Sequence, residues 1–232
     1  MFTRTFPKSL GSALALLSAL TANSLAQNPA VSTNVGPAKW EAEIKAFEAA
    51  DKTNPPPRNA TLFVGSSSVR LWKTLARDFP GYKVVNRGFG GSQIEDSIAF
   101  ADRVVIPYRP KTIVLYAGDN DIAAGKSPEQ VAADFKRFAQ KIHAALPRTR
   151  IAFISIKPSP ARWHLVEKTK AANQMIEDFC RQDKRRIYID VFNPMLGPDG
   201  QPRADLFVED KLHMNPGGYA LWSALIKPWL RK

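Results

Sequence analysis

The chain has 232 residues, enough for one α/β domain that buries a sizeable hydrophobic core. Its formal net charge is +12 at pH 7, and its single cysteine, Cys180, excludes an internal disulfide and therefore the class of disulfide-stapled domains. The basic residues are scattered, and the densest cluster, 181–186, contains an aspartate and precedes an expected strand, so we predict a solvated loop there and no nucleic-acid partner.

Residues 1–26 have the pattern of a cleaved secretory signal peptide. Two basic residues form a positive start, an apolar run extends from Leu10 to Leu20, and Ser24 and Ala26 place small residues at the cleavage position. The apolar run is short for a membrane span, which argues against the alternative of an uncleaved anchor. We therefore predict a secreted or periplasmic protein with no stable membrane insertion after cleavage and a remaining charge of about +10.

Residues 27–57 are expected to form a linker and a helix, and residues 58–232 the functional domain. In that domain, apolar runs predict strands at 61–64, 83–86, 112–117, 150–156 and 186–191. Helical patterns lie at 40–50, 69–77, 92–105, 128–146 and 164–182, and Pro216 opens a last helix to about Leu230. Strands that alternate with helices indicate a parallel sheet covered on both faces.

Polar residues follow each expected strand, where open α/β sheets place their ligand sites. The five strand ends read, in order, GSSS, NRGFGGSQ, GDND, KPSPARWH and, after a longer loop, DKLH. These segments hold the side chains and the backbone N–H groups from which a catalytic site could be built. We therefore searched them for a nucleophile, a base and an oxyanion pocket.

Only one of the three histidines is a good candidate base for a serine nucleophile. His143 lies within an expected helix, and His164 has no carboxylate at a suitable spacing before it. His213 follows Asp210 by three residues, so one turn allows the carboxylate to orient the imidazole. Taken alone, Asp-x-x-His is also typical of a surface turn, and a serine before a helix is typical of a cap, so single motifs leave both interpretations open.

Donors for an oxyanion come from three strand ends. Gly91 offers a backbone N–H without an obstructing side chain, Asn120 a side-chain amide, and Ser67 its own backbone N–H. Each has a structural alternative, a tight turn for the glycine and an Asx turn for the asparagine. Their occurrence in order at one edge of one sheet favours acyl-transfer chemistry.

The blocks resemble those of the SGNH, or GDSL-type, hydrolase family over the stretch from Phe63 to Tyr219. FVGSSS, NRGFGGS, GDND and DKLH correspond to its four motifs in the family's order. The resemblance implies a nucleophile, two oxyanion donors, a triad acid and a base, which are Ser67, Gly91, Asn120, Asp210 and His213. It also implies an α/β/α three-layer, flavodoxin-like fold with a five-stranded parallel sheet, and ester hydrolysis through an acyl-enzyme without metal or cofactor.

The chain departs from the family pattern beside the nucleophile. Ser66 stands where the namesake motif has aspartate. Register after Gly65 favours Ser67 as the nucleophile, with Ser68 as the fallback and as the better capping candidate. The G-x-S-x-G elbow is absent, because Val69 follows Ser68, and this argues against the α/β-hydrolase fold.

The substrate is predicted to be a small ester, with short acyl groups such as acetyl on carbohydrate preferred. Lysophospholipase or acyl thioesterase activity is the alternative, and a non-catalytic glycan- or phosphate-binding module is a rival from another class. The segment KPSPARWH is expected to line the cleft, where Trp163 could stack on a sugar and Arg162 or Lys157 could meet an acidic group. A packed loop is an equally good interpretation of that segment, and no pattern indicates an oligomeric state.

Overall fold

The computed structural model describes residues 37–230 of the chain. The predicted signal peptide and the first part of the predicted linker lie outside the described residues. Within residues 37–230, no helix combines the length and the apolarity that crossing a bilayer requires.

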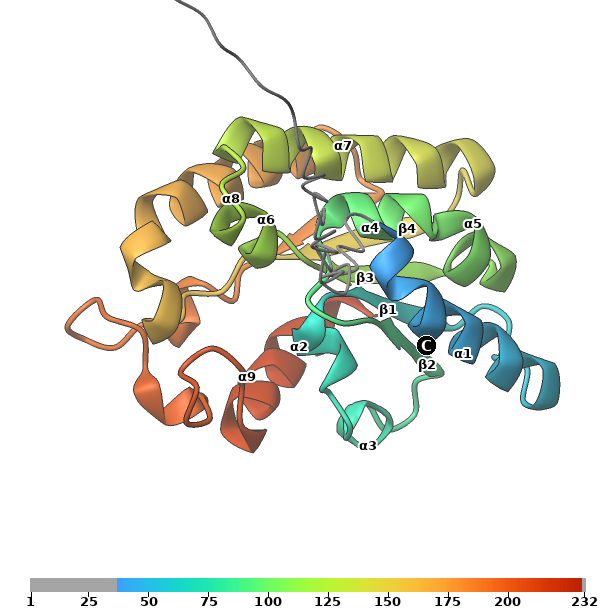
Figure 1. Ribbon diagram of the computed structural model, residues 1–232, viewed down its shortest axis with the longest axis horizontal. Coiled ribbons are helices and arrows are strands. Elements are labelled where there is room, and N and C mark those ends of the chain that lie inside the picture. Colours follow the sequence, from blue (N-terminus) through green and yellow to red (C-terminus); the bar gives the residue numbers. More distant parts are fainter. Residues whose placement is uncertain (1–36, 231–232) are drawn as a thin grey trace, which may run out of the picture. The chain divides into compact units, whose positions relative to one another are not determined.

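Five parallel strands form a single sheet in the middle of the domain (Figure 1). They run in the spatial order β2-β1-β3-β4-β5. Their bounds are Thr61–Gly65 (β1), Val84–Gly88 (β2), Thr112–Tyr116 (β3), Arg150–Ile154 (β4) and Arg186–Ile189 (β5). Each strand begins within one residue of its predicted start, and the order is that of the flavodoxin-like fold, so the predicted fold class is confirmed.

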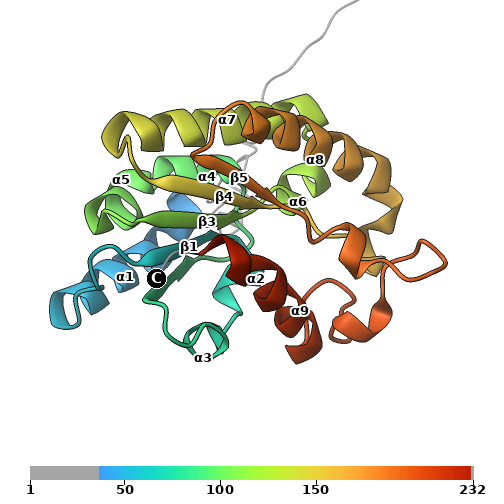
Figure 2. The same cartoon turned by 180° about the vertical axis from the view of Figure 1, so that it is seen from behind.

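Helices cover both faces of the sheet (Figures 1 and 2). One face carries α1 (Glu41–Thr53), α4 (Ile94–Ala99), α5 (Ala101–Val104), α7 (Pro128–Ala145) and α8 (Val166–Arg181). The other face carries α2 (Ser67–Arg70), α3 (Leu75–Asp78) and α9 (Pro216–Ile226). A short helix, α6 (Asp119–Ala123), follows β3 at the carboxyl edge of the sheet.

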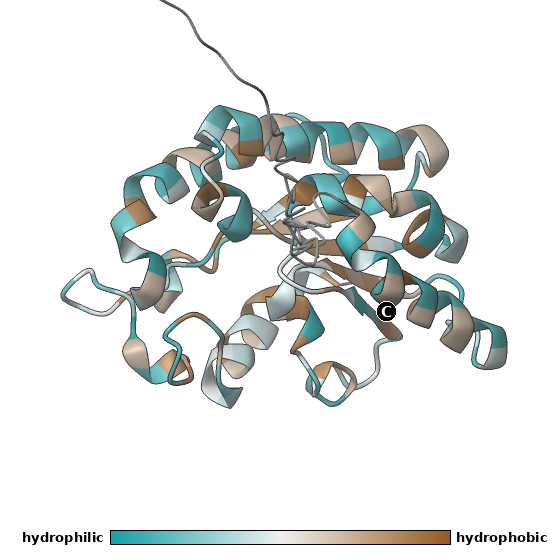
Figure 3. Cartoon of the chain, in the orientation of Figure 1, coloured by the Kyte–Doolittle hydropathy of each residue, from teal (hydrophilic) through white to brown (hydrophobic). Residues whose placement is uncertain are grey.

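The two faces of the sheet bury separate hydrophobic clusters. Figure 3 shows hydrophobic residues along the strands that lie between them. Successive side chains of a strand point to opposite faces, so Leu62 and Val64 enter the cluster under α1, α5, α7 and α8, while Phe63 enters the other. Trp222 of α9 is fully buried in that second cluster. Cys180 is buried in the first cluster, and burial raises the pKa of its thiol to about 12.

The structure divides two of the predicted helical segments and adds one helix that was not predicted. The helix expected at 69–77 is the pair α2 and α3, and the one expected at 92–105 is the pair α4 and α5, which meet at Phe100. Helix α6 was not predicted, because its five residues are too few for a 3.6-residue periodicity to emerge.

Candidate active site

The sequence-predicted site residues lie at the carboxyl edge of the sheet. Ser67 follows β1, Gly91 follows β2, Asn120 follows β3, and Asp210 and His213 lie in the long loop after β5. Because all five strands are parallel, these endings converge on one side of the domain. The hydrogen bonds below establish which of these residues meet.

Ser67 is the first residue of α2, directly after a sharp turn. Gly65 adopts φ +126°, and a Cβ placed there would lie 1.9 Å from the carbonyl oxygen of Tyr116, so no other residue fits this turn without displacing β3. Ser66 N–H donates to that same carbonyl over 2.9 Å. At the first position of the helix, the Ser67 N–H has no intrahelical acceptor.

The side chains of the two neighbouring serines are buried, so these residues are poor candidates for the nucleophile. Ser66 occupies the N-cap position of α2 without a capping side-chain bond, and Ser68 lies inside the helix, so the prediction that Ser68 is the better cap is wrong. Ser66 and Ser68 are 0% and 1% exposed, whereas Ser67 is partly exposed. Only Ser67 of the three therefore combines access to solvent with the start of the helix.

Ser67, His213 and Asp210 form a continuous hydrogen-bonded chain. His213 Nε2 lies 3.0 Å from Ser67 Oγ, across 146 positions of sequence, and His213 Nδ1 lies 2.6 Å from Asp210 Oδ2. An ionised carboxylate only accepts hydrogen bonds, so Nδ1 carries the proton and Nε2 is the free acceptor that faces the serine hydroxyl. This is the geometry of a nucleophile, a general base and an orienting acid.

Asp210 is held in its ionised form by its surroundings. Partial burial acts to raise its pKa, but the His213 ring and the backbone N–H groups of His213 and Leu212 outweigh it and lower the pKa to about 2. The other carboxylate oxygen, Oδ1, accepts from both of those N–H groups at 2.8 Å. The carboxylate therefore orients the histidine ring and the loop at the same time.

Two contacts join the Asp210–His213 loop to the rest of the domain. An antiparallel bridge between Phe207 and Met214 closes the base of the loop. Beyond it, the Tyr219 hydroxyl of α9 donates to the Ser68 carbonyl over 3.0 Å. The loop that carries the base and the helix that carries the nucleophile are therefore held together through α9. No local pattern in the sequence indicated that Tyr219 would connect them.

Gly91 and Asn120 face each other across the ends of β2 and β3. A Cβ at Gly91 would lie 3.7 Å from Asn120 Nδ2, so the space beside the glycine is bounded by the amide. Asn120 Nδ2 donates one hydrogen to the Ser92 carbonyl over 3.1 Å, which leaves its second hydrogen available. The two predicted oxyanion donors are therefore brought together.

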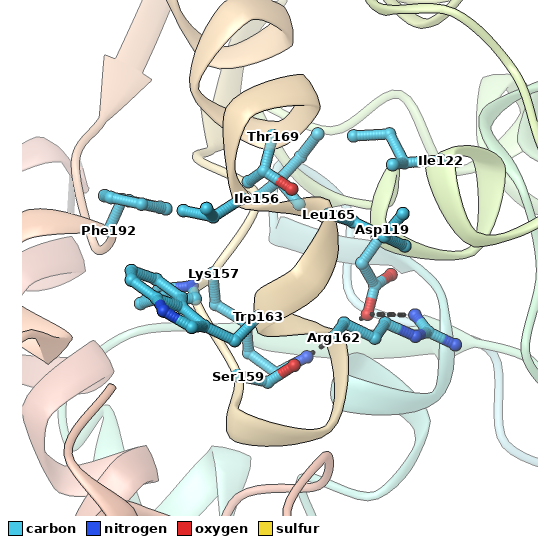
Figure 4. Close-up of a pocket in the computed structure, with 12 residues that line it drawn as sticks. Asp119, Ile122, Ile156, Lys157, Ser159, Arg162, Trp163, Leu165, Thr169 and Phe192 are labelled. Atoms are coloured by element: carbon cyan, nitrogen blue, oxygen red, sulfur yellow. Dashed lines mark hydrogen bonds and ion pairs between the residues drawn. The ribbon is translucent and has the colours of Figure 1, made fainter. Parts of the chain in front are cut away.

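The Asn120 amide is oriented by a charged network that extends to β4. Arg162 Nη2 donates to Asn120 Oδ1 over 2.9 Å, and Arg162 Nη1 lies 3.1 Å from Asp119 Oδ2 (Figure 4). The same carboxylate oxygen lies 3.2 Å from Lys157 Nζ, which also donates to the Tyr116 hydroxyl over 3.0 Å. Hence Arg162 fixes which end of the amide faces Gly91.

Asp119 and Lys157 form the buried centre of this network. Their side chains are 7% and 1% exposed. Burial acts to raise the pKa of Asp119, but Lys157 and Arg162 outweigh it and hold that pKa below its usual value. Burial lowers the pKa of Lys157, against the opposing effect of Asp119. Direct substrate contact by Lys157 stays a prediction, and its ammonium group already has two protein partners.

Trp163 points away from Arg162 on the other side of the 3₁₀ helix Pro160–Leu165 (Figure 4). It is half-buried and lines a narrow pocket together with Phe192 and Ile156. Asp119 was not singled out from the sequence, although it directly precedes Asn120. The signal was its place after β3, next to the basic residues that follow the neighbouring strand β4.

The helix α1 supports the turn that carries Gly91. Gly90 adopts φ +38°, and a Cβ there would lie 1.8 Å from the Trp40 ring. Gly90 N–H donates to Glu43 Oε2 over 3.2 Å, and the same oxygen lies 3.2 Å from Arg70 Nε of α2. One carboxylate therefore bridges the glycine turn and the nucleophile helix. In the part of the chain that the structure describes, no group of three or more His, Cys, Asp or Glu could hold a metal ion.

Residues 58–221 match the family model described as the GDSL-like lipase/acylhydrolase family. Solved structures that share the fold include the following three. A Streptococcus pneumonia protein named as a candidate platelet activating factor is 22% identical (TM-score 0.73; 83% of this chain and 94% of that chain covered). A GDSL-like lipase of Bacteroides thetaiotaomicron is 20% identical (TM-score 0.71; 81% and 97%). A candidate acylhydrolase of Bacteroides fragilis is 17% identical (TM-score 0.68; 80% and 95%). No curated protein matches the chain.

Proposed function

The chain belongs to the GDSL-like lipase/acylhydrolase family, and we propose from this that it cleaves carboxylic esters through an acyl-enzyme formed on Ser67. The observation that carries the proposal is the chain of hydrogen bonds from Ser67 through His213 to Asp210, with distances of 3.0 and 2.6 Å. Residues with only a structural role have no reason to meet in this order at the edge of the sheet.

In the first half-reaction, Ser67 Oγ attacks the ester carbonyl while His213 Nε2 takes the hydroxyl proton. Asp210 keeps the ring in the required tautomer and stabilises the imidazolium. Collapse of the tetrahedral intermediate breaks the bond to the alcohol, which leaves with the proton from His213. Water then repeats the sequence on the acyl-enzyme and releases the carboxylic acid.

The negative charge that develops on the carbonyl oxygen needs fixed donors. We assign this role to the backbone N–H groups of Ser67 and Gly91 and to the Asn120 amide. The amide already has its oxygen bound to Arg162, so no rotation is needed when the charge forms. Preorganised donors of this kind contribute about 10²–10³ in kcat each.

Labelling with a fluorophosphonate probe tests the nucleophile. Ser67→Ala should abolish labelling and the hydrolysis of p-nitrophenyl acetate. Ser66→Ala and Ser68→Ala are the matched controls and should retain both, since their hydroxyls are buried. Labelling that disappears in Ser68→Ala instead would transfer the role to that residue. Absence of both labelling and hydrolysis in the wild type would favour the rival binding module.

We further propose short acyl groups, with acetyl on carbohydrate as the preferred class. Arg162, which is partly exposed beside Asn120, is a charged group that suits a polar substrate better than a long alkyl chain. Trp163, half-buried on the other side of the 3₁₀ helix from Arg162, is the aromatic side chain that we propose for stacking on a sugar ring. Comparing kcat/KM for p-nitrophenyl acetate, butyrate and dodecanoate tests the acyl preference. A maximum at dodecanoate would favour the lysophospholipase or thioesterase alternative.

Secretion after cleavage behind Ala26 is likewise a proposal, supported by the charge and apolarity pattern of residues 1–26. The mass of the mature protein recovered from a secreting host measures the cleavage site. Recovery of the full-length chain in the cytoplasm would contradict it.

A further inference from the structure

A basic groove lies at the edge of the sheet opposite the candidate active site. Its volume is about 880 Å³, within the range of ligand-binding clefts. It is bordered by the segments that lead into β1, β3 and β4. Among the residues of 37–230 that line it, five are basic and none is acidic. The basic residues are Arg58, Arg109, Lys111, Arg148 and Arg150.

Three of these side chains have no carboxylate partner within the described part of the chain. Arg58, Arg109 and Arg148 are exposed, and none forms an ion pair with another residue of 37–230. Most of the other described arginines form ion pairs, as Arg103 does with Glu48 and Arg185 with Asp183. Unpaired like charges around one concavity repel each other, and a bound polyanion would relieve that repulsion.

Hydrogen bonds hold the groove in shape. The buried Thr149 hydroxyl donates to the Pro110 carbonyl over 2.8 Å and joins the segments before β3 and β4. Lys111 N–H donates to the Ala60 carbonyl over 3.1 Å and joins β1 to the same structure. Arg109 sits in the left-handed region at φ +45°, an uncommon conformation for arginine that the surrounding loops maintain. The basic side chains of the groove therefore extend from loops whose backbones are joined by hydrogen bonds.

We propose that this groove is a second binding site, which takes a segment of a carboxylated or sulfated polysaccharide. Arginine forks match carboxylate and sulfate groups in a bidentate manner, and a concave site admits a chain that passes between the loops. A flat bilayer fits such a concavity poorly, and the exposed large apolar side chains of the described domain (Leu71, Met175, Val208 and Trp229) do not line it. None of the described residues that line it is aromatic and able to stack on bases, which disfavours single-stranded nucleic acid.

The groove goes beyond the proposed esterase function and does not depend on it. A strand of five residues is about 17 Å long, so the groove and the triad lie at least that far apart along the sheet. A bound polysaccharide would therefore leave the triad open. It would hold the protein on an anionic matrix while Ser67 acts on esters nearby.

Binding of fluorescein-labelled heparin oligosaccharide to the full chain, followed by anisotropy at several salt concentrations, tests the proposal. The double variant Arg58→Glu/Arg148→Glu should weaken binding about tenfold or more and flatten its salt dependence. Lys136→Glu/Lys168→Glu is the matched control, since both lysines are exposed, lie outside the groove and change the net charge equally. It should change the affinity by less than about twofold.

Hydrolysis of p-nitrophenyl acetate should be unaffected in both double variants, which checks that they fold, and Arg58→Ala/Arg148→Ala provides a milder version of the test. Equal weakening by the groove and control variants would reduce the effect to net charge and overturn the proposal. Tighter binding to phosphatidylglycerol vesicles or to duplex DNA through the same arginines would also overturn it. Heparin binding that survives in Ser67→Ala, whatever that variant does to esters, separates this site from the esterase proposal.

Discussion

Replacing Arg162 with methionine should lower kcat without changing KM, because the guanidinium acts on the Asn120 amide. Methionine keeps an unbranched stem similar to the aliphatic part of arginine and removes the donor that now lies 2.9 Å from Asn120 Oδ1. The buried pair of Asp119 and Lys157 keeps its charge balance in this variant, so the fold should survive. The amide is then free to rotate and to present its oxygen, in place of its nitrogen, to the oxyanion.

The structure limits the size of the effect from both sides. A hydrogen bond from a charged group contributes about 1.5–3 kcal/mol, and the lower value applies here because the Arg162 side chain is 22% exposed. About 1.5 kcal/mol corresponds to roughly a tenfold loss of kcat. Removal of the donor itself in Asn120→Ala should cost about 10²–10³, which is the upper bound for any effect that acts through the amide.

A double-mutant cycle on p-nitrophenyl acetate separates this role from substrate binding. If Arg162 works through Asn120, the variant Asn120→Ala/Arg162→Met should be no slower than Asn120→Ala alone. A higher KM with unchanged kcat would mean that Arg162 binds the substrate directly, as the sequence first suggested. Losses that multiply in the double variant would refute the orienting role.

Asp210→Asn should lower kcat by about 10³–10⁴, because the amide no longer selects the right tautomer of His213. The pKa of Asp210 is about 2, so its carboxylate stays ionised across the assay range. Wild-type kcat/KM should therefore rise with pH through a single ionisation between pH 4 and 9. A second inflection in that range would contradict this prediction. Glu43→Ala should lower kcat several-fold, because the turn at Gly90 loses its carboxylate acceptor, and Glu43→Gln should retain part of the rate. Glu48→Ala, on the same helix, is the control and should affect only thermal stability. Burial raises the pKa of Asp121 to about 6, above its unfolded value of about 3.9, so its contribution to stability is present below pH 4 and is lost as pH rises through 6. Urea unfolding from pH 4 to 8 should show Asp121→Asn lacking this decline, and parallel pH profiles for wild type and variant would count against it.

The sequence alone determined the architecture of the domain. Apolar runs such as TIVLY and RIAFI are fully or almost fully buried strands, and their alternation with helices leaves a parallel sheet as the consistent arrangement. The topology then placed Ser67, Gly91, Asn120 and the Asp210–His213 loop at one edge. These inferences succeed because hydrophobic periodicity and short motifs are local properties of the chain.

The tertiary structure decided which of those residues meet and what else gathers around them. Asp119 meets Arg162 and Lys157 only because β3 and β4 are neighbours, and together these three charged residues support Asn120. In the same way, arginines that are scattered in sequence line one groove because their strands begin side by side. Contacts between residues so far apart depend on the packing of the whole sheet and its helices, and no local pattern of the chain encodes them.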